Sequence, residues 1–493
     1  MQKSYIKEHI MIILYAALAI LLMLAAIMAV NTVSGRPKKE QTAKPEPPLL
    51  DKEKIAHNLS GMIRIKTVTS ESMEDIDSEA FLSFHQYLKD TYPLVHKTLE
   101  QETINEYALL YKWKGEDKGG KPFLMMAHMD VVPVDERTAD KWEHEAFSGD
   151  IADGYVWGRG TIDMKGQLAA IMESVEYLLG QGFKPKRDIY IALGFDEERM
   201  GTLGAKNTAK LLEERGVRLA FVLDEGGVFM DGSDIGINGR IASIGICEKG
   251  YTDIKLIAES AGGHSSLPPK QTAVGSLSKA VVALEKHQMK PSLNEALRLM
   301  LEKAGGYMRF PRNVIAANPL LAKPLLIRGL LSNPIGAAAV RTTTAPTMLK
   351  GSSAPNVLAE KAEAVVNFRL APDDDMDKLL THVRKTVGSG IKVEVLVPPH
   401  PSKVSSIGSE AYGMIERTAK EIFDGFIITP YLMVATTDSR WFSHISDGVY
   451  LFEPFRSLCD DYHKIHTANE RLCIDSLCEG VEFFIRLVKR AAG

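Results

Sequence analysis

Short apolar runs that end in acidic residues recur along the chain and predict an α/β fold. Three of them are "KPFLMMAHMD", "RDIYIALGFDEE" and "RLAFVLDEGG", each typical of a buried strand with polar residues at its carboxyl end. Apolar positions follow a helical period over residues 164–179 and 474–490. This alternation predicts a mixed sheet with helices on both faces. In open sheets of this kind the ligand crevice lies at the carboxyl ends of the strands.

The pattern changes over residues 248–399. "YTDIKLIAES", "KAEAVVNFRLAP" and "IKVEVLVPP" have the two-residue period of strands with one solvated face, whereas "QTAVGSLSKAVVALEKHQ" and "DMDKLLTHVRKTVG" have a helical period. Two helices on one side of a small antiparallel sheet form a self-contained α+β unit. We expect this unit to be inserted into a larger domain made of residues 51–247 and 400–493. Residues 292–340 are expected to add helices and loops to the inserted unit.

The N-terminal part of the chain predicts a transmembrane helix. Residues 10–30 read "IMIILYAALAILLMLAAIMAV" without a charge, and about 20 apolar residues span a bilayer. We expect a tail at 1–9, a single-pass membrane anchor at 10–33 and a linker rich in proline and charge at 34–50. A buried core helix would show a polar face. A cleaved signal peptide stays the rival interpretation, although its apolar core usually has only about 7–15 residues.

The side of the membrane that would hold the folded part is left open by the flanking charges. Lys3 and Lys7 precede the apolar segment, and the linker that follows it is also basic. Taken literally, the positive-inside rule places the body in the cytoplasm. Glu40 and the prolines of the linker weaken that indication.

Composition narrows the function only slightly. The chain has 493 residues, of which 45% are hydrophobic and 25% charged, as in an ordinary globular protein. A formal net charge of -4 gives no reason to expect nucleic-acid binding. Four cysteines are too few for a disulfide scaffold in so long a chain. Three of them lie near the C-terminus and leave one disulfide open: Cys459, Cys473 and Cys478.

Acidic and histidine residues at the ends of the predicted strands are the candidate chemistry. They are His128, Asp130, Asp163, Glu197, Glu198, Asp224 and His466. Each alone has an ordinary interpretation, as a hydrogen-bonded histidine, a helix N-cap or an acidic turn. Together they suit two zinc ions that share one bridging carboxylate, with one glutamate left over as a base. Two zinc ions with a bridged water hydrolyse amides.

Six motifs in order carry a resemblance to a known family. They are "HMDVVPV", "WGRGTIDMKG", "GFDEE", "LDEGG", "GGHSSLPP" and "KIHTANE". Together they resemble the zinc metallopeptidase family of carboxypeptidase S, glutamate carboxypeptidase and aminoacylase. "AGGHSSLPPKQTAVG", "RTTTAPT" and "AEAVVNFRLAP" bring the chain nearest to the branch of carboxypeptidase S and the N-fatty-acyl-amino-acid synthase/hydrolases. The resemblance runs from about residue 51 to the end and implies that the inserted unit is a lid and dimerisation domain.

The resemblance assigns the metal ligands. His128 and Asp224 would bind one zinc ion, Glu198 and His466 the second, and Asp163 would bridge both. In "KIHTANE" the residues that follow the histidine select His466 over the nearby His463, and Thr467 stands where relatives often have glycine. Co²⁺ or Mn²⁺ can occupy similar nitrogen and oxygen sites, so the native metal stays open.

Two acids of the same cluster would act beside the metals. Glu197 is implied to be the general base, which requires hydrogen-bond reach of the attacking water. Asp130 follows His128 by two residues and would point the same way in a strand. It can then accept the other imidazole N–H and fix the tautomer of that histidine.

Three residues of the inserted unit are implied to contact the substrate. His264 in "GGHSS" would hold the developing oxyanion, in relatives often in the site of a partner subunit. Arg369 in "NFRLAP" would grip a free carboxylate through two parallel hydrogen bonds. Asn356 in "SAPNVL" would assist Arg369. The ordinary interpretations are a turn residue for His264 and an exposed strand charge for Arg369.

These expectations converge on a membrane-anchored enzyme with two Zn²⁺. It would cleave an amide next to a free carboxylate in small peptides or N-acyl amino acids, and it could form a homodimer through the inserted domain. Three alternatives stay open: a reversible N-acyl-amino-acid synthase/hydrolase, a general amidohydrolase in which Arg369 has another role, and a non-catalytic membrane-anchored binding protein. The acyl group or side chain that the site accepts is not encoded in any recognisable motif.

Overall fold

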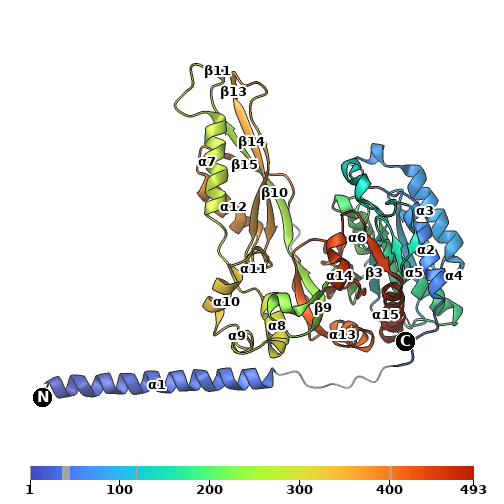
Figure 1. The fold of residues 1–493 in the computed structure, drawn as a ribbon, viewed down its shortest axis with the longest axis horizontal. Helices are drawn as coiled ribbons and strands as arrows, with labels where there is room; N and C mark the ends of the chain where they lie inside the picture. Colours follow the sequence, from blue (N-terminus) through green and yellow to red (C-terminus); the bar gives the residue numbers. More distant parts are fainter. Residues whose placement is uncertain (1, 36–44, 71, 118, 399–401) are drawn as a thin grey trace.

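The computed structural model describes residues 2–35, 45–70, 72–117, 119–398 and 402–493, and for residues 2–8, 234 and 235 the backbone alone. Figure 1 shows two lobes side by side, with a long N-terminal helix below the smaller lobe. The larger lobe is built on a nine-stranded sheet and the smaller on a four-stranded one. Residues 36–44 of the predicted linker and the predicted domain boundary at 399–400 lie outside the described residues.

The large sheet is mixed, as the sequence predicts. Its main order is β1-β2-β6-β3-β7-β17-β9-β16, and β8 pairs with β9. Strand β3 runs parallel to β6 and β7, whereas β2 is antiparallel to β6. The strands are β1 (Glu100–Ile104), β2 (Ala108–Trp113), β3 (Phe123–His128), β6 (Ile189–Gly194), β7 (Val222–Asp224), β8 (Val228–Asp231), β9 (Arg240–Glu248), β16 (Phe426–Met433) and β17 (Val449–Leu451).

Helices cover both faces of this sheet because its central strands are apolar on both sides. On β3, Phe123 and Met125 belong to one buried cluster and Leu124 and Met126 to another. The first cluster is shared with α2 (Lys52–Arg64), α5 (Lys165–Gly180) and α15 (Ile474–Ala492), and the second with α6 (Ala205–Glu214). The fold brings the first and last parts of the chain together here, since α15 packs on α5 and α2.

The smaller lobe is a separate antiparallel sheet with two helices on one side. Its order is β12-β14-β10-β15, with β12 (Thr343–Lys350), β14 (Lys361–Leu370), β10 (Gly250–Glu259) and β15 (Lys392–Val395). Helices α7 (Ala273–Lys286) and α12 (Met376–Val387) share its core. The strands β11 (Gly263–His264) and β13 (Val357–Leu358) pair at the end of this lobe that lies farthest from α1 in Figure 1.

The segment that follows α7 contacts both lobes. Helix α8 (Glu295–Ala304) packs against β16 of the large sheet, and Ala296 belongs to the core of the large lobe. Apolar residues of α8 therefore join the two lobes. Three short helices follow: α9 (Arg312–Ala316), α10 (Lys323–Leu330) and α11 (Pro334–Val340).

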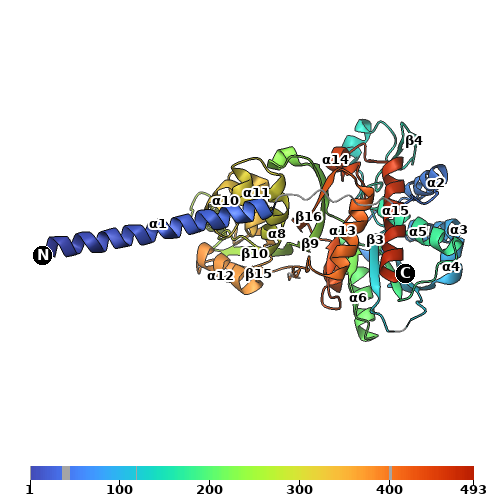
Figure 2. The ribbon, with the colours of Figure 1, turned by 90° about the horizontal axis from the view of Figure 1, so that it is seen from below.

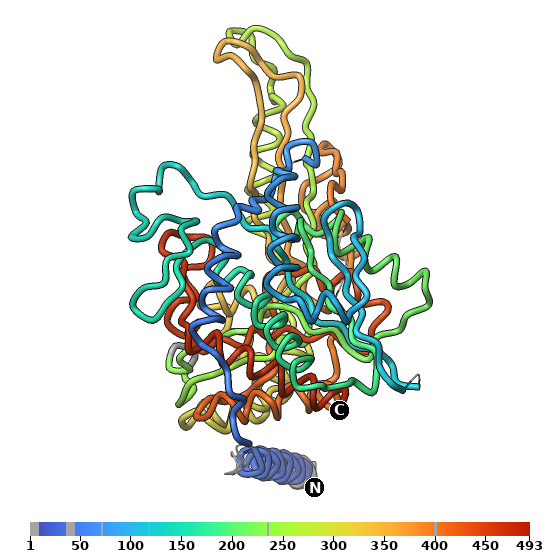
Figure 3. The backbone as a smooth tube through the Cα atoms, turned by 90° about the vertical axis from the view of Figure 1, so that its right-hand side faces the viewer, coloured from blue at the N-terminus to red at the C-terminus, as the bar shows by residue number. Residues whose placement is uncertain are grey.

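The N-terminal helix α1 (Gln2–Ser34) begins earlier than predicted, so residues 2–9 of the expected tail are part of the helix. Residues 9–34 have a mean hydropathy of 2.9 over their most apolar window and are exposed, as suits a membrane span or a signal sequence. Figure 2 shows α1 running beneath α10 and projecting beyond the small lobe, and Figure 3 shows it end-on below the body. The Asn31 amide donates to Oδ1 of Asn318 at 2.9 Å. The four cysteines are free.

Candidate metal centre

Neighbouring strand ends bring the candidate residues together. His128 is the last residue of β3, and Glu197 and Glu198 begin a short 3-10 helix (Glu197–Arg199) just after β6. Asp224 is the last residue of β7, and the chain turns at Glu225. Because β3 lies between β6 and β7 and is parallel to both, the three carboxyl ends share one edge of the sheet.

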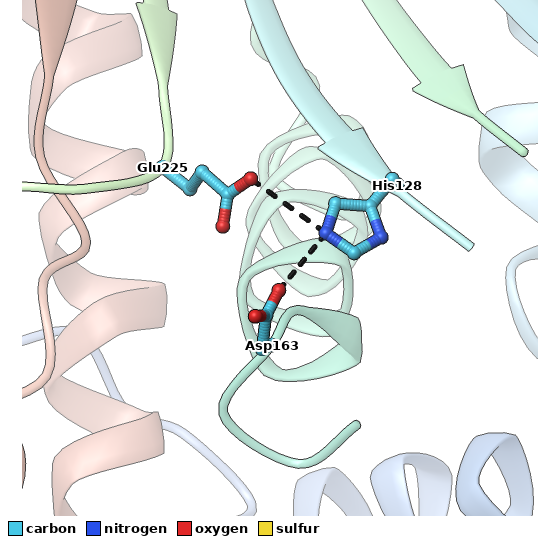
Figure 4. Close-up of side chains that lie close together, drawn as sticks. All are labelled: His128, Asp163 and Glu225. Atoms are coloured by element: carbon cyan, nitrogen blue, oxygen red, sulfur yellow. Dashed lines mark hydrogen bonds and ion pairs between the residues drawn. The ribbon is translucent and has the colours of Figure 1, made fainter. Parts of the chain in front are cut away.

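One group joins His128, Asp163 and Glu225. Nε2 of His128 lies 3.0 Å from Oδ1 of Asp163 and 3.6 Å from Oε1 of Glu225 (Figure 4). Asp163 stands just before α5, and its peptide bond to Met164 is cis. One potential ligand atom from each of the three side chains lies within 4.8 Å of the others, the spacing of a metal site.

Glu225 occupies the position that the sequence analysis gave to Asp224. The carboxylate of Asp224 turns the other way, where Oδ1 accepts from the backbone N–H of Glu225 at 2.9 Å and Oδ2 from that of Ser439 at 2.9 Å. Asp224 is still in a regular strand, whereas Glu225 begins a turn that continues through Gly226 and Gly227, both at positive φ. The side chain beyond the strand therefore reaches the crevice, whereas both carboxylate oxygens of Asp224 accept backbone N–H groups.

A second group joins Asp163, Glu198 and His466. Nε2 of His466 lies 2.9 Å from Oδ2 of Asp163 and 3.2 Å from Oε1 of Glu198. His466 is half-exposed and has a φ of 61°, in a loop between Lys464 and β18 (Arg471–Cys473). Asp163 thus offers one carboxylate oxygen to each group, which is the geometry of a bridging ligand.

Asp130 supports the first group without joining it. Its backbone carbonyl lies 2.9 Å from Nδ1 of His128, and its Oδ1 lies 3.4 Å from the same atom. The two carboxylate oxygens accept the backbone N–H groups of Glu197 and Glu198 at 3.2 and 3.1 Å. Asp130 is buried. It therefore orients the imidazole and also fixes the turn that presents both glutamates.

Glu197 lies beside the first group but outside both sets of close ligand atoms. Its Oε2 is 4.0 Å from Nε2 of His128. Burial raises the pKa of Glu197 well above its usual range, and the charges of Asp438 and Glu198 raise it further. A carboxyl group with a raised pKa can exchange a proton near neutral pH.

The electrostatics of the cluster fit cations. Burial and the charge of Asp163 raise the pKa of both Glu198 and Glu225. Burial alone would also raise the pKa of Asp163, but hydrogen bonds from His128 and His466 lower it. Divalent ions would relieve the repulsion among these buried carboxylates. Two imidazole nitrogens and several carboxylate oxygens suit Zn²⁺, and also Co²⁺ or Mn²⁺. The residues therefore fit a dinuclear centre.

Glu470 organises the loop that carries Asp163 and escaped the sequence analysis. Its Oε1 accepts the backbone N–H groups of Gly160 and Ile162 at 2.9 and 3.0 Å, and Oε2 accepts from Nη1 of Arg159 at 2.5 Å. Both Glu470 and Arg159 are buried. The only sequence signal is that Glu470 ends the motif "KIHTANE".

Arg369 lies where the two lobes meet. It pairs with Tyr251 across β14 and β10, and its guanidinium carbon lies 4.7 Å from the centre of the Tyr251 ring. Its Nη1 donates to Oγ1 of Thr436 at 3.4 Å, and Thr436 lies just before the 3-10 helix Asp438–Phe442, which contains Ser439, the partner of Asp224. Among the described residues, no carboxylate lies within 4.0 Å of Arg369 as an ion-pair partner.

His264 and Asn356 are not brought to the metal centre of their own chain. They lie at the tip of the small lobe, where the N–H of Ser265 donates to the backbone carbonyl of Asn356 at 3.0 Å. Both are exposed. Arg369 is at the other end of β14, a strand of ten residues that spans about 30 Å. Within one chain, Asn356 therefore lies far from Arg369, and its assistance to Arg369 stays a prediction.

The fold and the two overlapping acid–histidine groups place the chain among the two-lobed metallohydrolases. It belongs to the peptidase family M20/M25/M40, which matches residues 124–490. The chain is 38% identical over 443 residues to "Probable carboxypeptidase S-like 2" of Dictyostelium discoideum, covering 88% of this chain and 84% of that protein. It is 34% identical over 485 residues to the N-fatty-acyl-amino acid synthase/hydrolase PM20D1 of Homo sapiens, covering 96% of both.

Solved structures show the same fold at low sequence identity. The M20 family metallo-carboxypeptidase Sso-CP2 from Sulfolobus solfataricus has a TM-score of 0.65 at 18% identity, covering 88% of this chain and 98% of that one. Human carnosine dipeptidase 1 has a TM-score of 0.61 at 12% identity, covering 90% and 100%. The predicted family and enzyme class are confirmed: the chain is a metallohydrolase of the carboxypeptidase S-like and PM20D1 branch.

Proposed function

We propose that the protein hydrolyses the amide bond of small peptides or N-acyl amino acids next to a free carboxylate. The observation that carries this proposal is Asp163, whose two oxygens are shared between two ligand groups. His128 and Glu225 would hold one Zn²⁺ with Asp163, and Glu198 and His466 the other. When bound, the two cations would polarise the scissile carbonyl and activate a water molecule.

Glu197 carries the proton in this proposal. Its carboxylate takes a proton from the attacking water while the C–O bond forms at the carbonyl carbon, and gives it to the amine nitrogen as the C–N bond breaks. Asp130 holds His128 in one orientation and fixes the backbone of Glu197.

Arg369 supports the choice of substrate class. A half-buried guanidinium without a carboxylate partner among the described residues can bind a substrate carboxylate through two parallel hydrogen bonds. The names of the relatives include both carboxypeptidases and N-fatty-acyl-amino acid synthase/hydrolases. One site catalyses a reaction in both directions, so condensation of an acid with an amino acid is the second candidate activity. A general amidohydrolase would leave the cation of Arg369 unexplained.

A second copy of the chain is proposed to complete the site. Strand β11, which ends in His264, lies at the tip of the small lobe and remote from β3 of the large sheet (Figure 1). The outer strand β12 exposes Met348 and Leu349, which could pack against the same strand of a partner. In a dimer His264 would reach the partner's site and hold the developing oxyanion.

Helix α1 is proposed to be an uncleaved membrane anchor. Its candidate span, His9–Ser34, has 26 residues and exceeds the core of a typical signal peptide. Mass spectrometry of the mature N-terminus tests this assignment, because a protein that begins after residue 30 would be the product of signal cleavage. The flanking charges leave the side of the membrane open.

A substrate screen tests the catalytic proposal. The purified enzyme with Zn²⁺ is incubated with dipeptides and N-acyl amino acids of varied acyl length, and products are identified by mass spectrometry. The Glu197→Gln variant serves as the matched control for contaminating activity. Cleavage of neither class by the natural enzyme, with both metals bound, would contradict the proposal.

A further inference from the structure

The short helices after α8 leave large apolar side chains uncovered. Phe310 is 82% exposed, Ile335 81% and Leu320 68%, and three leucines between them are also exposed. We name these six side chains the outer apolar surface: Phe310, Leu320, Leu321, Leu325, Leu331 and Ile335. Large uncovered apolar side chains gathered in one short segment mark a contact surface.

These side chains are not a core that packs poorly. On α10, Leu326 and Leu330 already pack inward against the cluster of Leu297 and Leu301. Leu325 is on the outside of the same helix and is 56% exposed. A helix with apolar side chains on two opposite faces buries both faces against other apolar groups. The small lobe itself covers only the inner side.

Charge indicates what covers the outer side. Residues 304–340 contain four basic residues and no aspartate or glutamate, in a chain with a net charge of -4. Arg309, Lys323 and Arg328 are exposed, and none pairs with a carboxylate among the described side chains. Apolar side chains beside exposed cations are typical of a segment that binds an anionic lipid surface.

The position of α1 gives the same indication. Its C-terminal part rests on α9, where Asn31 donates to Asn318 and the Asn318 amide donates to the carbonyl of Met28 at 3.2 Å. Val314 lines a small cavity with Ala25 and Met28. An anchor that spans the membrane leaves it near its C-terminal end. The outer apolar surface therefore lies beside the point at which the chain would emerge from the bilayer (Figures 1 and 2).

We propose that the outer apolar surface docks the small lobe on the bilayer that holds α1, with Arg309, Lys323 and Arg328 at the level of anionic lipid headgroups. This inference rests on the proposed anchor. A second copy of the chain fits the surface less well, because a two-fold interface would bring together two copies of a segment that has basic residues and no aspartate or glutamate. Docking would hold the small lobe, and Arg369 with it, at a membrane in which amphipathic N-acyl amino acids dissolve.

Tryptophan quenching by lipids with brominated acyl chains tests the docking. The full chain is synthesised in the presence of phosphatidylcholine–phosphatidylserine nanodiscs, as Phe310→Trp and, as matched control, Leu82→Trp. Leu82 is 56% exposed on α3 (Ser78–Thr91) of the large lobe. Trp at 310 should lose about half of its added emission in brominated discs, since interfacial side chains enter roughly 5–10 Å. Trp at 82 should lose none beyond that of the natural chain.

The possible outcomes separate this inference from the anchor. A full chain that does not co-migrate with the nanodiscs overturns the anchor and the docking surface together. A chain that co-migrates but is quenched equally at 310 and 82 overturns the docking surface alone. The combined substitutions Lys323→Glu and Arg328→Glu test the role of the cations. That role is supported if these substitutions reduce the quenching at 310, and do so only in discs with phosphatidylserine.

Discussion

Asp224 and Glu225 are neighbours in the chain, yet their carboxylates face different parts of the structure. Oε1 of Glu225 lies 3.6 Å from Nε2 of His128, whereas Oδ2 of Asp224 accepts the backbone N–H of Ser439. The carboxylate of Glu225 faces the candidate metal centre. The carboxylate of Asp224 holds Ser439, which lies close in the chain to Thr436, the hydrogen-bond partner of Arg369. The pair therefore links the chemistry of the site to the junction between the lobes.

Substitution of each neighbour should separate these two roles. Glu225→Gln is expected to lower the metal content from two ions per chain toward one, because a neutral amide is a poor ligand. Asp224→Asn is expected to keep two ions and to lose about 1–3 kcal/mol of stability, since one of its backbone donors loses its acceptor. Metal analysis and urea unfolding of both variants measure the two effects. The opposite pattern of metal loss would restore Asp224 as the ligand.

Asp163 should be needed for both ions. Its oxygens lie 3.0 and 2.9 Å from the two histidines, so Asp163→Ala removes a ligand from each group. Mass spectrometry under native conditions should then show a chain without tightly bound metal, while His466→Ala should retain one ion. An Asp163→Ala protein with full metal content would show that the carboxylate is not shared.

Glu197 should be needed for turnover and not for metal. Glu197→Gln keeps the size and polarity of the side chain but removes the basic oxygen. We expect two ions per chain and a fall in kcat of about 10²–10⁴, the usual contribution of a general base. Loss of an ion from this variant would make Glu197 a ligand instead. The folded state is checked by comparing the near-ultraviolet circular dichroism of both proteins.

The sequence predicts the parts of this site that depend on regular strands. His128 is placed by the end of β3, and the glutamates after β6 follow because parallel strands bring their ends to one edge. The choice between Asp224 and Glu225 depends on a turn with two glycines at positive φ, where the alternation of a strand no longer holds. The role of Glu470 depends on a contact with Ile162, far away in the chain, that no local pattern encodes.

The buried pair of Glu470 and Arg159 should be a large contributor to stability. Glu470→Ala leaves the guanidinium of Arg159 buried without its partner, and removal of one member of such a pair costs about 3–5 kcal/mol. Glu470→Gln keeps an oxygen for the N–H groups of Gly160 and Ile162 and should cost less. Urea unfolding compares the two variants. A loss below about 1 kcal/mol for Glu470→Ala would show that the loop before α5 does not need this contact.

Arg369 should select substrates that carry a free carboxylate. A charge-assisted hydrogen bond contributes about 1.5–3 kcal/mol, or roughly 10–150-fold. Amidation of the substrate carboxylate should therefore lower kcat/KM of the natural enzyme at least about tenfold. The same amidation should cost the Arg369→Ala variant little, because the partner of the carboxylate is already absent.

The control for this comparison is Arg369→Lys, which keeps the positive charge but offers no planar pair of donors. It should retain part of the preference for the free acid, since a point charge still attracts the carboxylate. The values of kcat/KM for the natural enzyme and for Arg369→Ala, each with free and amidated substrate, form a double-mutant cycle. General damage to the junction between the lobes cancels in this cycle. If the natural enzyme cleaves amidated and free substrates equally well, Arg369 does not bind the substrate carboxylate. Its stacking on Tyr251 would then be its main role, and a general amidohydrolase would describe the enzyme better.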